Sequence, residues 1–286
     1  MKWLMKYILL IVGLASGVAY GQTKVEVITK TITDQFIYNP GYGLKVEGKA
    51  ATIRLRSWDE KRIKITMKLI SKGLTKEVAE KELSYHQYAI GENNRQYVVR
   101  NYLLLPGDVE KLSTIQEAII EVMVPRSINL EIENSLGTIG ITDINGFIEI
   151  DNEYGDVTIT SCSGKISLTN TFGELKLDGF VGTLSADLSH TASQVMNFAG
   201  SAVMKTNLGD VEWRESGKIE KVRIELLRSD LSLKGLSFDE FYWQLKTRYG
   251  EIVTPRDLAG NKINYGNNDF PTIEVSSDFG KIMIEE

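Results

Sequence analysis

A regular alternation of apolar and polar residues runs through the centre of the chain. Apolar residues stand two and four positions after successive glycines, as in Val157 and Ile159 after Gly155. Because side chains alternate between the two faces of a strand, this pattern predicts short strands that each bury one face. Glycine before each strand suits a tight turn or a close backbone approach. The glycines stand nine residues apart and, after one skipped position, resume in phase: Gly137, Gly146, Gly155, Gly164, Gly173, Gly182, Gly200 and Gly209.

Bulky residues define a longer period, twice that of the glycines. One slot, directly before alternate glycines, holds Leu136, Tyr154, Phe172 and Leu208, and a second slot holds Ile144, Cys162, Phe180 and Phe198. We therefore expect coils of two strands each, in which both sets of bulky side chains fill the corners. A meander of hairpins has no reason to keep this phase, and helical repeats need a spacing near 3.6. Asn134, Asn152 and Asn170 follow the same doubled period, which predicts a ladder of hydrogen-bonded amides.

These features predict an all-β fold in which residues 126–286 form a β-solenoid with coils of about 18 residues. Residues 22–125 are predicted to be β-rich with one helix near residues 75–90, capped by Thr75 and placing Ile90 on its apolar face. This part is either an irregular N-terminal region or the first coils of the solenoid. We expect the aromatic residues 238–245 to form an end cap rather than a ligand platform, and the polar residues 255–271 to form a projecting loop.

The repeat style carries a family resemblance. Residues 132–160, "IENSLGTIGITDINGFIEIDNEYGDVTIT", together with "IRLRSWDEKRIKITMKL" and "SSDFGKIMIEE", resemble the adhesin-like β-helix family of exported bacterial envelope proteins. The resemblance implies that the solenoid is a right-handed parallel β-helix and that the protein lies in the cell envelope.

The N-terminus predicts export. Lys2 and Lys6 precede an apolar run, Tyr7–Leu14, and Ala19-Tyr20-Gly21 matches a signal-peptidase site, so we expect residues 1–21 to be removed. The run is shorter than the roughly 20 residues that cross a bilayer, and we expect no integral membrane span. The formal charge of −5 becomes −7 when both lysines are lost, which argues against a nucleic-acid partner. The predicted location is the periplasm or the outside of the cell.

Candidate chemistry is sparse. Asp156 and Glu174 are expected one coil apart on an outward face, which is the nearest approach to the carboxylate pair of a polysaccharide-acting enzyme. His190 occupies a bulky corner slot at the point where Thr191 replaces the expected glycine. It either belongs to a site in that irregular coil or is a corner residue whose hydrogen bonds are satisfied within the protein. Cys162 is expected to be a buried small hydrophobe, and His86 lies in the predicted helix, away from any second histidine. We assign no catalytic, cofactor-binding or metal-binding residue.

The expected function is a non-enzymatic, adhesin-like binding or structural module of the cell envelope. Its expected partner is an envelope protein or a glycan, and no cofactor is implied. Two alternatives remain open at this point: a β-helix lyase or hydrolase that uses a groove beside the loop 255–271, and a periplasmic sensor or regulatory partner.

Overall fold

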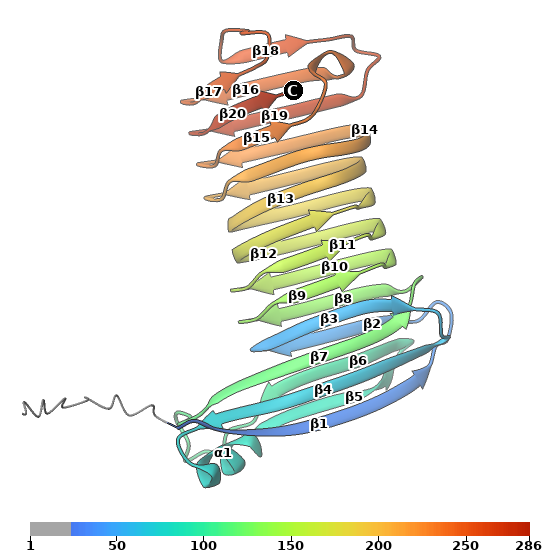
Figure 1. Ribbon diagram of the computed structural model, residues 1–286, viewed down its shortest axis with the longest axis vertical. Helices are drawn as coiled ribbons and strands as arrows, with labels where there is room; N and C mark the ends of the chain where they lie inside the picture. Colours follow the sequence, from blue (N-terminus) through green and yellow to red (C-terminus); the bar gives the residue numbers. More distant parts are fainter. Residues whose placement is uncertain (1–23) are drawn as a thin grey trace, which may run out of the picture.

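All strands that the structure describes belong to one sheet. The computed structural model of the chain describes residues 24–286, and the backbone alone at residues 215 and 216. The described part contains twenty strands, one α-helix and one short 3-10 helix, and the twenty strands are hydrogen-bonded into a single sheet. The strands lie across the long axis of the molecule and follow one another along it (Figure 1). The predicted signal peptide lies outside the described residues.

The N-terminal end combines antiparallel and parallel pairs. β1 pairs antiparallel with β4 and β4 with β7, while β5 pairs antiparallel with β6. β2 and β3 then continue the sheet in parallel, β2 beside β6 and β3 beside β7. The elements are β1 Glu26–Ile37, β2 Gly43–Lys49, β3 Ala51–Trp58, β4 Arg62–Gly73, α1 Lys76–Leu83, β5 His86–Asn93, β6 Gln96–Leu103 and β7 Ile115–Pro125.

Parallel pairing with a constant register forms the centre of the molecule. Ile148 pairs with Ile166 and Ile166 with Leu184, so that paired residues are 18 positions apart. At the corners the backbones touch: a Cβ atom on Gly155 would lie 1.8 Å from the carbonyl oxygen of Gly137, a distance that only glycine permits. The elements are β8 Asn129–Ser135, β9 Ile139–Thr142, β10 Asn145–Glu153, β11 Val157–Thr160, β12 Ser163–Asp178 and β13 Val181–Asn207.

At the C-terminal end, strands that are neighbours in the sheet no longer follow one another in the sequence. β19 pairs with β14 on one side and β16 on the other, and β20 lies between β15 and β17. β18 closes this end as an antiparallel partner of β16. The elements are β14 Val211–Leu227, β15 Leu231–Lys234, η1 Phe238–Glu240, β16 Tyr242–Arg248, β17 Glu251–Val253, β18 Lys262–Tyr265, β19 Thr272–Asp278 and β20 Lys281–Glu285.

The predicted fold class therefore needs correction. The chain is all-β, as expected, but it is not a right-handed parallel β-helix: its strands form one barrel-shaped, nearly closed sheet of mixed parallel and antiparallel pairing. Antiparallel pairs occur at both ends, in β1–β4–β7 and in β16–β18. The glycine and apolar spacing reports which residues are buried and how far apart paired residues stand. It does not report the direction of the terminal strands, which depends on contacts between segments far apart in the sequence.

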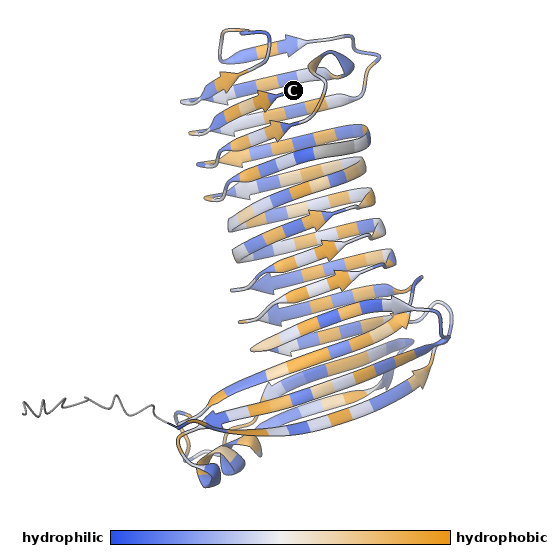
Figure 2. Cartoon of the chain, in the orientation of Figure 1, coloured by the Kyte–Doolittle hydropathy of each residue, from blue (hydrophilic) through white to orange (hydrophobic). Residues whose placement is uncertain are grey.

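The sheet forms two walls around one core. We call wall one the strands in line with β2, β8 and β10, and wall two the strands in line with β3, β9 and β11. Inward residues of both walls belong to one buried cluster, and the alternation of apolar and polar residues along each strand is visible in Figure 2. Phe180 and Phe198, predicted for the core, are fully buried, and Phe198 meets Trp213 edge to face at 5.1 Å. Along the strands of both walls, alternate residues thus contribute to one continuous core, whereas β1 contributes only partly buried residues such as Ile28 and Ile32.

Three local predictions can be compared with these elements. The helix α1 begins after its N-cap Thr75 but ends at Leu83, and Ile90, which was placed on its apolar face, belongs to strand β5. Pairing with β6 outweighs the helical periodicity there. Within residues 238–245 the rings of Phe238, Phe241 and Trp243 are buried in the core, and the Trp243 ring nitrogen donates to the Phe238 carbonyl at 2.8 Å, while Asp239 and Glu240 are exposed. The segment 255–271 was predicted as a loop but contains β18.

Candidate binding surface

One corner of the sheet carries a line of unusual backbone conformations. Eight residues there have φ between 51° and 62°, the left-handed region that non-glycine residues seldom adopt. Backbone hydrogen bonds across the corner, such as Tyr154 N–H to Thr171 O, order them along the molecule. We call this set the corner stripe; in order it comprises Leu136, Tyr154, Phe172, His190, Leu208, Arg228, Phe279 and Tyr249.

The residue that follows each stripe position explains the conformation. Glycine follows Tyr154 and Phe172, and a Cβ atom on Gly173 would lie 2.2 Å from the carbonyl oxygen of Gly155. The chain is therefore held tightly against the neighbouring turn at this point. The left-handed residue before the glycine turns its side chain away from the core and toward solvent. Two members are followed by a buried hydroxyl residue instead, Thr191 after His190 and Ser229 after Arg228.

The apolar members of the corner stripe are exposed. The exposed fractions are 49% for Tyr154, 40% for Phe172 and 75% for Tyr249. This corrects the expectation that Leu136, Tyr154, Phe172 and Leu208 fill a corner of the core. The other predicted slot is buried as expected, with Ile144, Cys162, Phe180 and Phe198 each at most 2% exposed.

The rings of the corner stripe stack on one another. Tyr154 and Phe172 are parallel within 2° with ring centroids 5.0 Å apart, and Phe172 stacks on His190 at 4.5 Å. A second stack joins Tyr249 to Phe279 at 4.9 Å. Because the rings cover one another's faces, their edges point outward. A partner therefore meets a ridge of ring edges and aliphatic side chains rather than a flat aromatic platform.

The opposite corner provides an internal comparison. Asp143, Ser161 and Asn197 have φ of 59°, 53° and 51°, the same conformation as the corner stripe. These are small polar residues, of which Asp and Asn are enriched in this region of φ and ψ. The backbone of a corner thus requires no large apolar side chain. The apolar residues of the corner stripe need another explanation than local geometry.

Carboxylates border the corner stripe. A shallow groove of about 690 Å³ beside it is lined by Asp156, Glu174, His190 and Asp210, among others. Two of these carboxylates are bound to the backbone of the next turn. Asp156 Oδ1 accepts from the Glu174 N–H at 2.9 Å, and Asp210 Oδ1 accepts from the Asp230 N–H at 3.0 Å.

The geometry of Asp156 and Glu174 bears on the enzymatic alternative. Both side chains are exposed, Asp156 binds a backbone N–H, and Glu174 Oε2 lies 3.2 Å from Lys176 Nζ. A glycoside hydrolase needs one carboxylic acid whose pKa is raised, usually by an apolar pocket, opposite a second carboxylate. Asp156 lines the open groove beside the corner stripe, and Glu174, which also lines a groove of about 370 Å³ on wall two, has Lys176 as its partner there rather than a second carboxylate. Asp156 thus joins two successive turns, while Glu174 pairs with Lys176 of its own strand.

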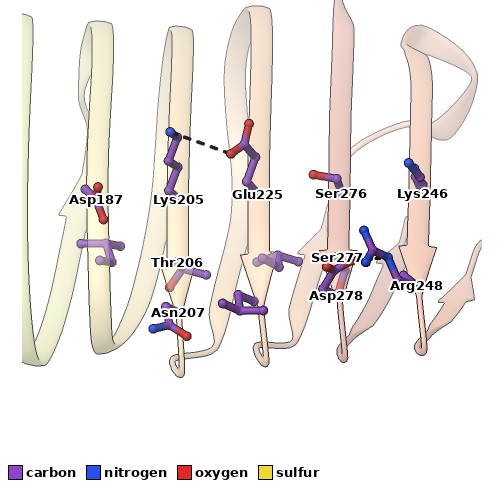
Figure 3. A pocket seen from close by; sticks show the side chains of 13 residues that line it. Asp187, Lys205, Thr206, Asn207, Glu225, Lys246, Arg248, Ser276, Ser277 and Asp278 are labelled. Atoms are coloured by element: carbon purple, nitrogen blue, oxygen red, sulfur yellow. Dashed lines mark ion pairs between the residues drawn. The ribbon is translucent and has the colours of Figure 1, made fainter.

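A second groove lies on wall one near the C-terminal end. It has a volume of about 480 Å³, and Figure 3 shows its charged side chains side by side on successive strands. Lys205 pairs with Glu225 at 4.0 Å, and Arg248 pairs with Asp278 at 3.5 Å. The charges of this groove therefore largely neutralise one another. Exposed pairs of this kind contribute little to stability and leave little net charge for a ligand.

The remaining predicted residues are mainly structural. Cys162 is buried, and burial raises the pKa of its thiol. His86 is also buried at the start of β5, and burial lowers the pKa of its imidazole. His190 is part of the corner stripe, with its Nδ1 3.1 Å from the Ser189 hydroxyl. Within residues 24–286, no three His, Cys, Asp or Glu side chains gather in a way that would hold a metal ion.

The predicted asparagine ladder is present. Asn134, Asn152 and Asn170 are buried, and each donates from its side-chain nitrogen to the next partner along the stack. Asn134 donates to Asn152 Oδ1 at 3.3 Å, and Asn152 donates to Asn170 Oδ1 at 2.7 Å. Asn170 donates to the Thr191 hydroxyl at 3.2 Å, where the ladder ends. These amides bind one another and the backbone, which favours a structural role over ligand binding.

Comparison with known proteins gives likeness in shape and none in sequence. No protein-family model matches the chain, and no curated protein matches it. Similar solved structures include a "putative cell adhesion protein" from Clostridium sporogenes, at 11% identity over 90% of this chain and 99% of the other, with a TM-score of 0.29. A "putative adhesin" from Bacteroides fragilis has 13% identity over 90% and 96%, with a TM-score of 0.40.

A "putative lipid binding protein" from Parabacteroides distasonis has 9% identity over 90% of this chain and 96% of the other, with a TM-score of 0.39. The similar solved structures thus include proteins named as adhesins, in line with the predicted resemblance to adhesin-like proteins. No match in sequence supports that resemblance. At these TM-scores nothing about function follows from the likeness. Within the described residues, no helix has both the length and the apolar character that crossing a membrane requires.

Proposed function

We propose that this protein is a non-enzymatic, adhesin-like binding module of the cell envelope that contacts its ligand along the corner stripe. The observation that carries the proposal is the exposure of large apolar side chains in a strained backbone conformation. Tyr154 is 49% exposed and has a φ of 58°. At the opposite corner the same backbone conformation is adopted by small polar residues, Ser161 and Asn197. Six of the eight residues carry exposed apolar side chains, with His190 and Arg228 among them, and exposed apolar patches of this kind are typical of interaction surfaces.

The shape of the corner stripe favours an elongated ligand. Its eight residues recur at the spacing of adjacent strands, so that seven steps of about 4.8 Å give a length of about 34 Å. The faces of Tyr154 and Phe172 are occupied by each other, which leaves ring edges for contact. An extended polypeptide or glycan chain lying along the ridge can use the whole line, whereas a small molecule can touch only one or two members.

The export predicted from the N-terminal sequence supports an envelope location. The N-terminal pattern of lysines, an apolar run and a small-residue cleavage site is that of a secretory signal peptide. A chain of this size with the single cysteine Cys162 depends on its core rather than on disulfides, and the continuous core between the two walls meets that need.

The proposal is tested by binding to arrays of glycans and of envelope proteins. Replacing Tyr154 and Phe172 together by asparagine removes two apolar side chains, and asparagine tolerates the left-handed conformation. We expect the wild-type protein to bind at least one arrayed glycan or protein, and the double variant to lose about tenfold or more in affinity, since truncating a buried aromatic contact costs more than about 1 kcal/mol per residue.

Ser161→Asn is the matched control. It introduces the same residue at the same backbone conformation, φ 53°, on the opposite corner. Its binding should equal that of the wild type. Equal binding by all three proteins would show that the ligand lies elsewhere, and an absence of binding to every arrayed glycan and protein would contradict the function itself.

A further inference from the structure

A buried histidine without an assigned role lies where α1 meets the sheet. His86 begins β5, shortly after α1 ends at Leu83, and only 3% of it is exposed. Its Nε2 lies 2.9 Å from Asn101 Nδ2, whereas its Nδ1 has no hydrogen-bond partner among the described residues. Because histidine gains and loses its proton close to neutral pH, the form that the buried ring takes decides how this part of the fold responds to acid.

The orientation of Asn101 decides which ring nitrogen carries the proton. Lys49 N–H donates to Asn101 Oδ1 at 3.1 Å, and Asn101 Nδ2 donates to the Lys49 carbonyl at 2.7 Å. Turning the amide over would set donor against donor and acceptor against acceptor. The nitrogen of Asn101 therefore faces His86 as a donor, and the imidazole Nε2 can only accept. The neutral ring must then carry its proton on Nδ1.

A second set of hydrogen bonds fixes Gln116, the other polar side chain that acts on the imidazole. The Thr114 hydroxyl donates to the Glu82 carboxylate at 2.7 Å, so it can only accept from Gln116 Nε2, which lies 2.6 Å away. Gln116 therefore presents its nitrogen to Thr114, and its buried Oε1 has no partner among the described residues. An unpaired acceptor thus accompanies the unpaired Nδ1–H donor of His86.

We propose that His86 is a pH switch at the α1 end of the molecule: the neutral imidazole holds α1 and β5 against the sheet, and its protonation releases them. A proton added to Nε2 would point at the donating nitrogen of Asn101, which cannot turn over while Lys49 holds it. The ring would also become a buried cation. Protonation therefore requires this contact to open.

The groups around His86 do not offset the cost of a buried cation. From α1 comes Glu82, whose carboxylate already accepts from the Thr114 N–H and hydroxyl groups. The groups from the other elements of the cluster are neutral: Asn101 of β6, Gln116 of β7, Ser71 of β4 and the backbone of Lys49 in β2. Burial lowers the pKa of His86, and the effect that opposes burial comes from the neutral Gln116.

The pH range of this switch differs from that of Glu82. Since the pKa of His86 is lowered in the folded protein, the stability from its neutral ring is fully present above the unfolded value of about 6.5. That stability is lost as the pH falls toward the lower folded value. An unfolded glutamate takes up its proton only near about pH 4.3, so Glu82 contributes little between about pH 7.5 and about pH 5.

Hydrogen exchange of the backbone amides measures the release of α1 and β5. The exchange is followed at about pH 7.5 and about pH 5 and corrected for the intrinsic rate at each pH. If only the open form takes up the proton, the opening constant rises about 30-fold over this range, given an unfolded pKa of about 6.5. The opening constants of β10 and β12 should change less than about twofold, because no buried histidine lies there.

His86→Gln removes the titration and keeps a side-chain oxygen that can accept from Asn101. We expect the opening constant of α1 and β5 in this variant to change less than about twofold between the two pH values, whatever its level at the higher pH. His190→Asn is the matched control, because it removes the other histidine of the sequence from an exposed position, and asparagine tolerates the φ of 52°. It should keep the rise of about 30-fold.

Nuclear magnetic resonance of the protein labelled with ¹⁵N-histidine tests the tautomer without a substitution. At about pH 7.5, His86 should show a protonated Nδ1 and an unprotonated Nε2. A protonated Nε2 at this pH would overturn the inference. An opening constant that does not rise in the wild type, or that rises equally in His86→Gln, would overturn it too. None of these measurements depends on the ligand proposed for the corner stripe.

Discussion

At the scale of single residues, the large side chains of the corner stripe are not those that its left-handed backbone conformation favours. A left-handed conformation costs a non-glycine residue about 1–2 kcal/mol, and an exposed apolar side chain recovers little of that by burial. Glycine or asparagine would fit these corners with less strain, as Gly179 and Asn197 do at the opposite corner. The identity of Tyr154 and Phe172 therefore contributes little to folding.

Substitution at the corner stripe should leave stability nearly unchanged. For Tyr154→Asn, the lost ring stack, about 0.5–1.5 kcal/mol, is partly offset by the better fit of asparagine to the left-handed conformation. We expect the free energy of unfolding to change by less than about 1.5 kcal/mol in urea titrations. Ile159→Ala, at a core position 1% exposed, should cost about 2–5 kcal/mol. A loss of comparable size for Tyr154→Asn would show that the corner stripe is structural.

The glycines at the corner, unlike the side chains of the corner stripe, are required for folding. In Gly155→Ala the new methyl group would lie 1.8 Å from the Gly137 carbonyl oxygen, so the two turns must separate. We expect a loss of about 3 kcal/mol or more in the free energy of unfolding. Gly91→Ala in β5 is the matched control, because nothing lies within 4 Å of the added Cβ and the strand can accept it. A Gly155→Ala protein as stable as the control would contradict the close approach of the turns.

At the scale of elements, buried polar side chains join neighbouring strands where apolar packing alone would not fix their register. Asn152 donates both to Asn170 Oδ1 and to the Gly155 carbonyl, and accepts from Asn134. Asn134, at the end of the ladder, has a side-chain oxygen with no hydrogen-bond partner in the described residues. Each buried polar group left without a partner costs about 1–3 kcal/mol.

The ladder therefore predicts unequal effects for equal substitutions. Asn152→Ala leaves groups of Asn134, Asn170 and Gly155 unpaired and should lower the free energy of unfolding by about 2–4 kcal/mol. Asn134→Ala removes fewer contacts and should cost about 1 kcal/mol less. Chemical denaturation of both variants measures the difference, and a larger loss for Asn134→Ala would contradict a ladder that is strongest at its centre.

The helix α1 is fastened to the sheet by a buried carboxylate. Glu82 is 8% exposed and accepts from the Ser113 and Thr114 N–H groups and from the Thr114 hydroxyl. Burial alone raises the pKa of Glu82, but these hydrogen bonds outweigh it and the pKa lies below its usual value. The charged form is therefore the one that holds the segment 113–114 against the helix.

A lowered pKa makes this contact sensitive to acid. Stability from Glu82 is fully present above the pKa of an unfolded glutamate, about 4.3, and is lost as the pH falls through the lower folded value. Glu82→Gln should destabilise the protein at pH 7 by about 1–3 kcal/mol, with the difference from wild type shrinking below about pH 4. Glu80→Gln, an exposed change on the same helix, should have little effect. A difference that does not change with pH would contradict the assignment.

At the scale of the whole molecule, the sequence predicts the burial and register of the repeated strands, but it does not predict the arrangement of the strands outside the repeat. The inward positions Val157, Ile159, Leu175 and Leu177 are buried as their alternation predicts, and the parallel register steps by the doubled glycine period. The direction of the terminal strands was not predictable, because β1, β4 and β7 are joined by contacts between distant segments. Thr66 of β4, for example, pairs with Glu121 on one side and with Thr33 on the other. Such pairings leave no local periodic signal.

The candidate site was missed for a related reason. Leu136, Tyr154 and Phe172 repeat as regularly as the core residues do, and apolar character alone cannot show which way a corner side chain points. The useful signal is the dipeptide itself: a large residue directly before a glycine that must pack on backbone adopts a left-handed turn and faces outward. In the other slot, two residues before the glycine, the side chain faces inward.

The most direct test of the account is hydroxyl-radical footprinting of the protein with the ligand that array screening identifies. Bound ligand should lower the modification rates of Tyr154, Phe172 and Leu208 several-fold and leave the groove around Lys205 and Lys246 unchanged. Protection confined to that groove, with Tyr154 and Phe172 modified as fast as in the free protein, would contradict the assignment of the corner stripe as the binding surface.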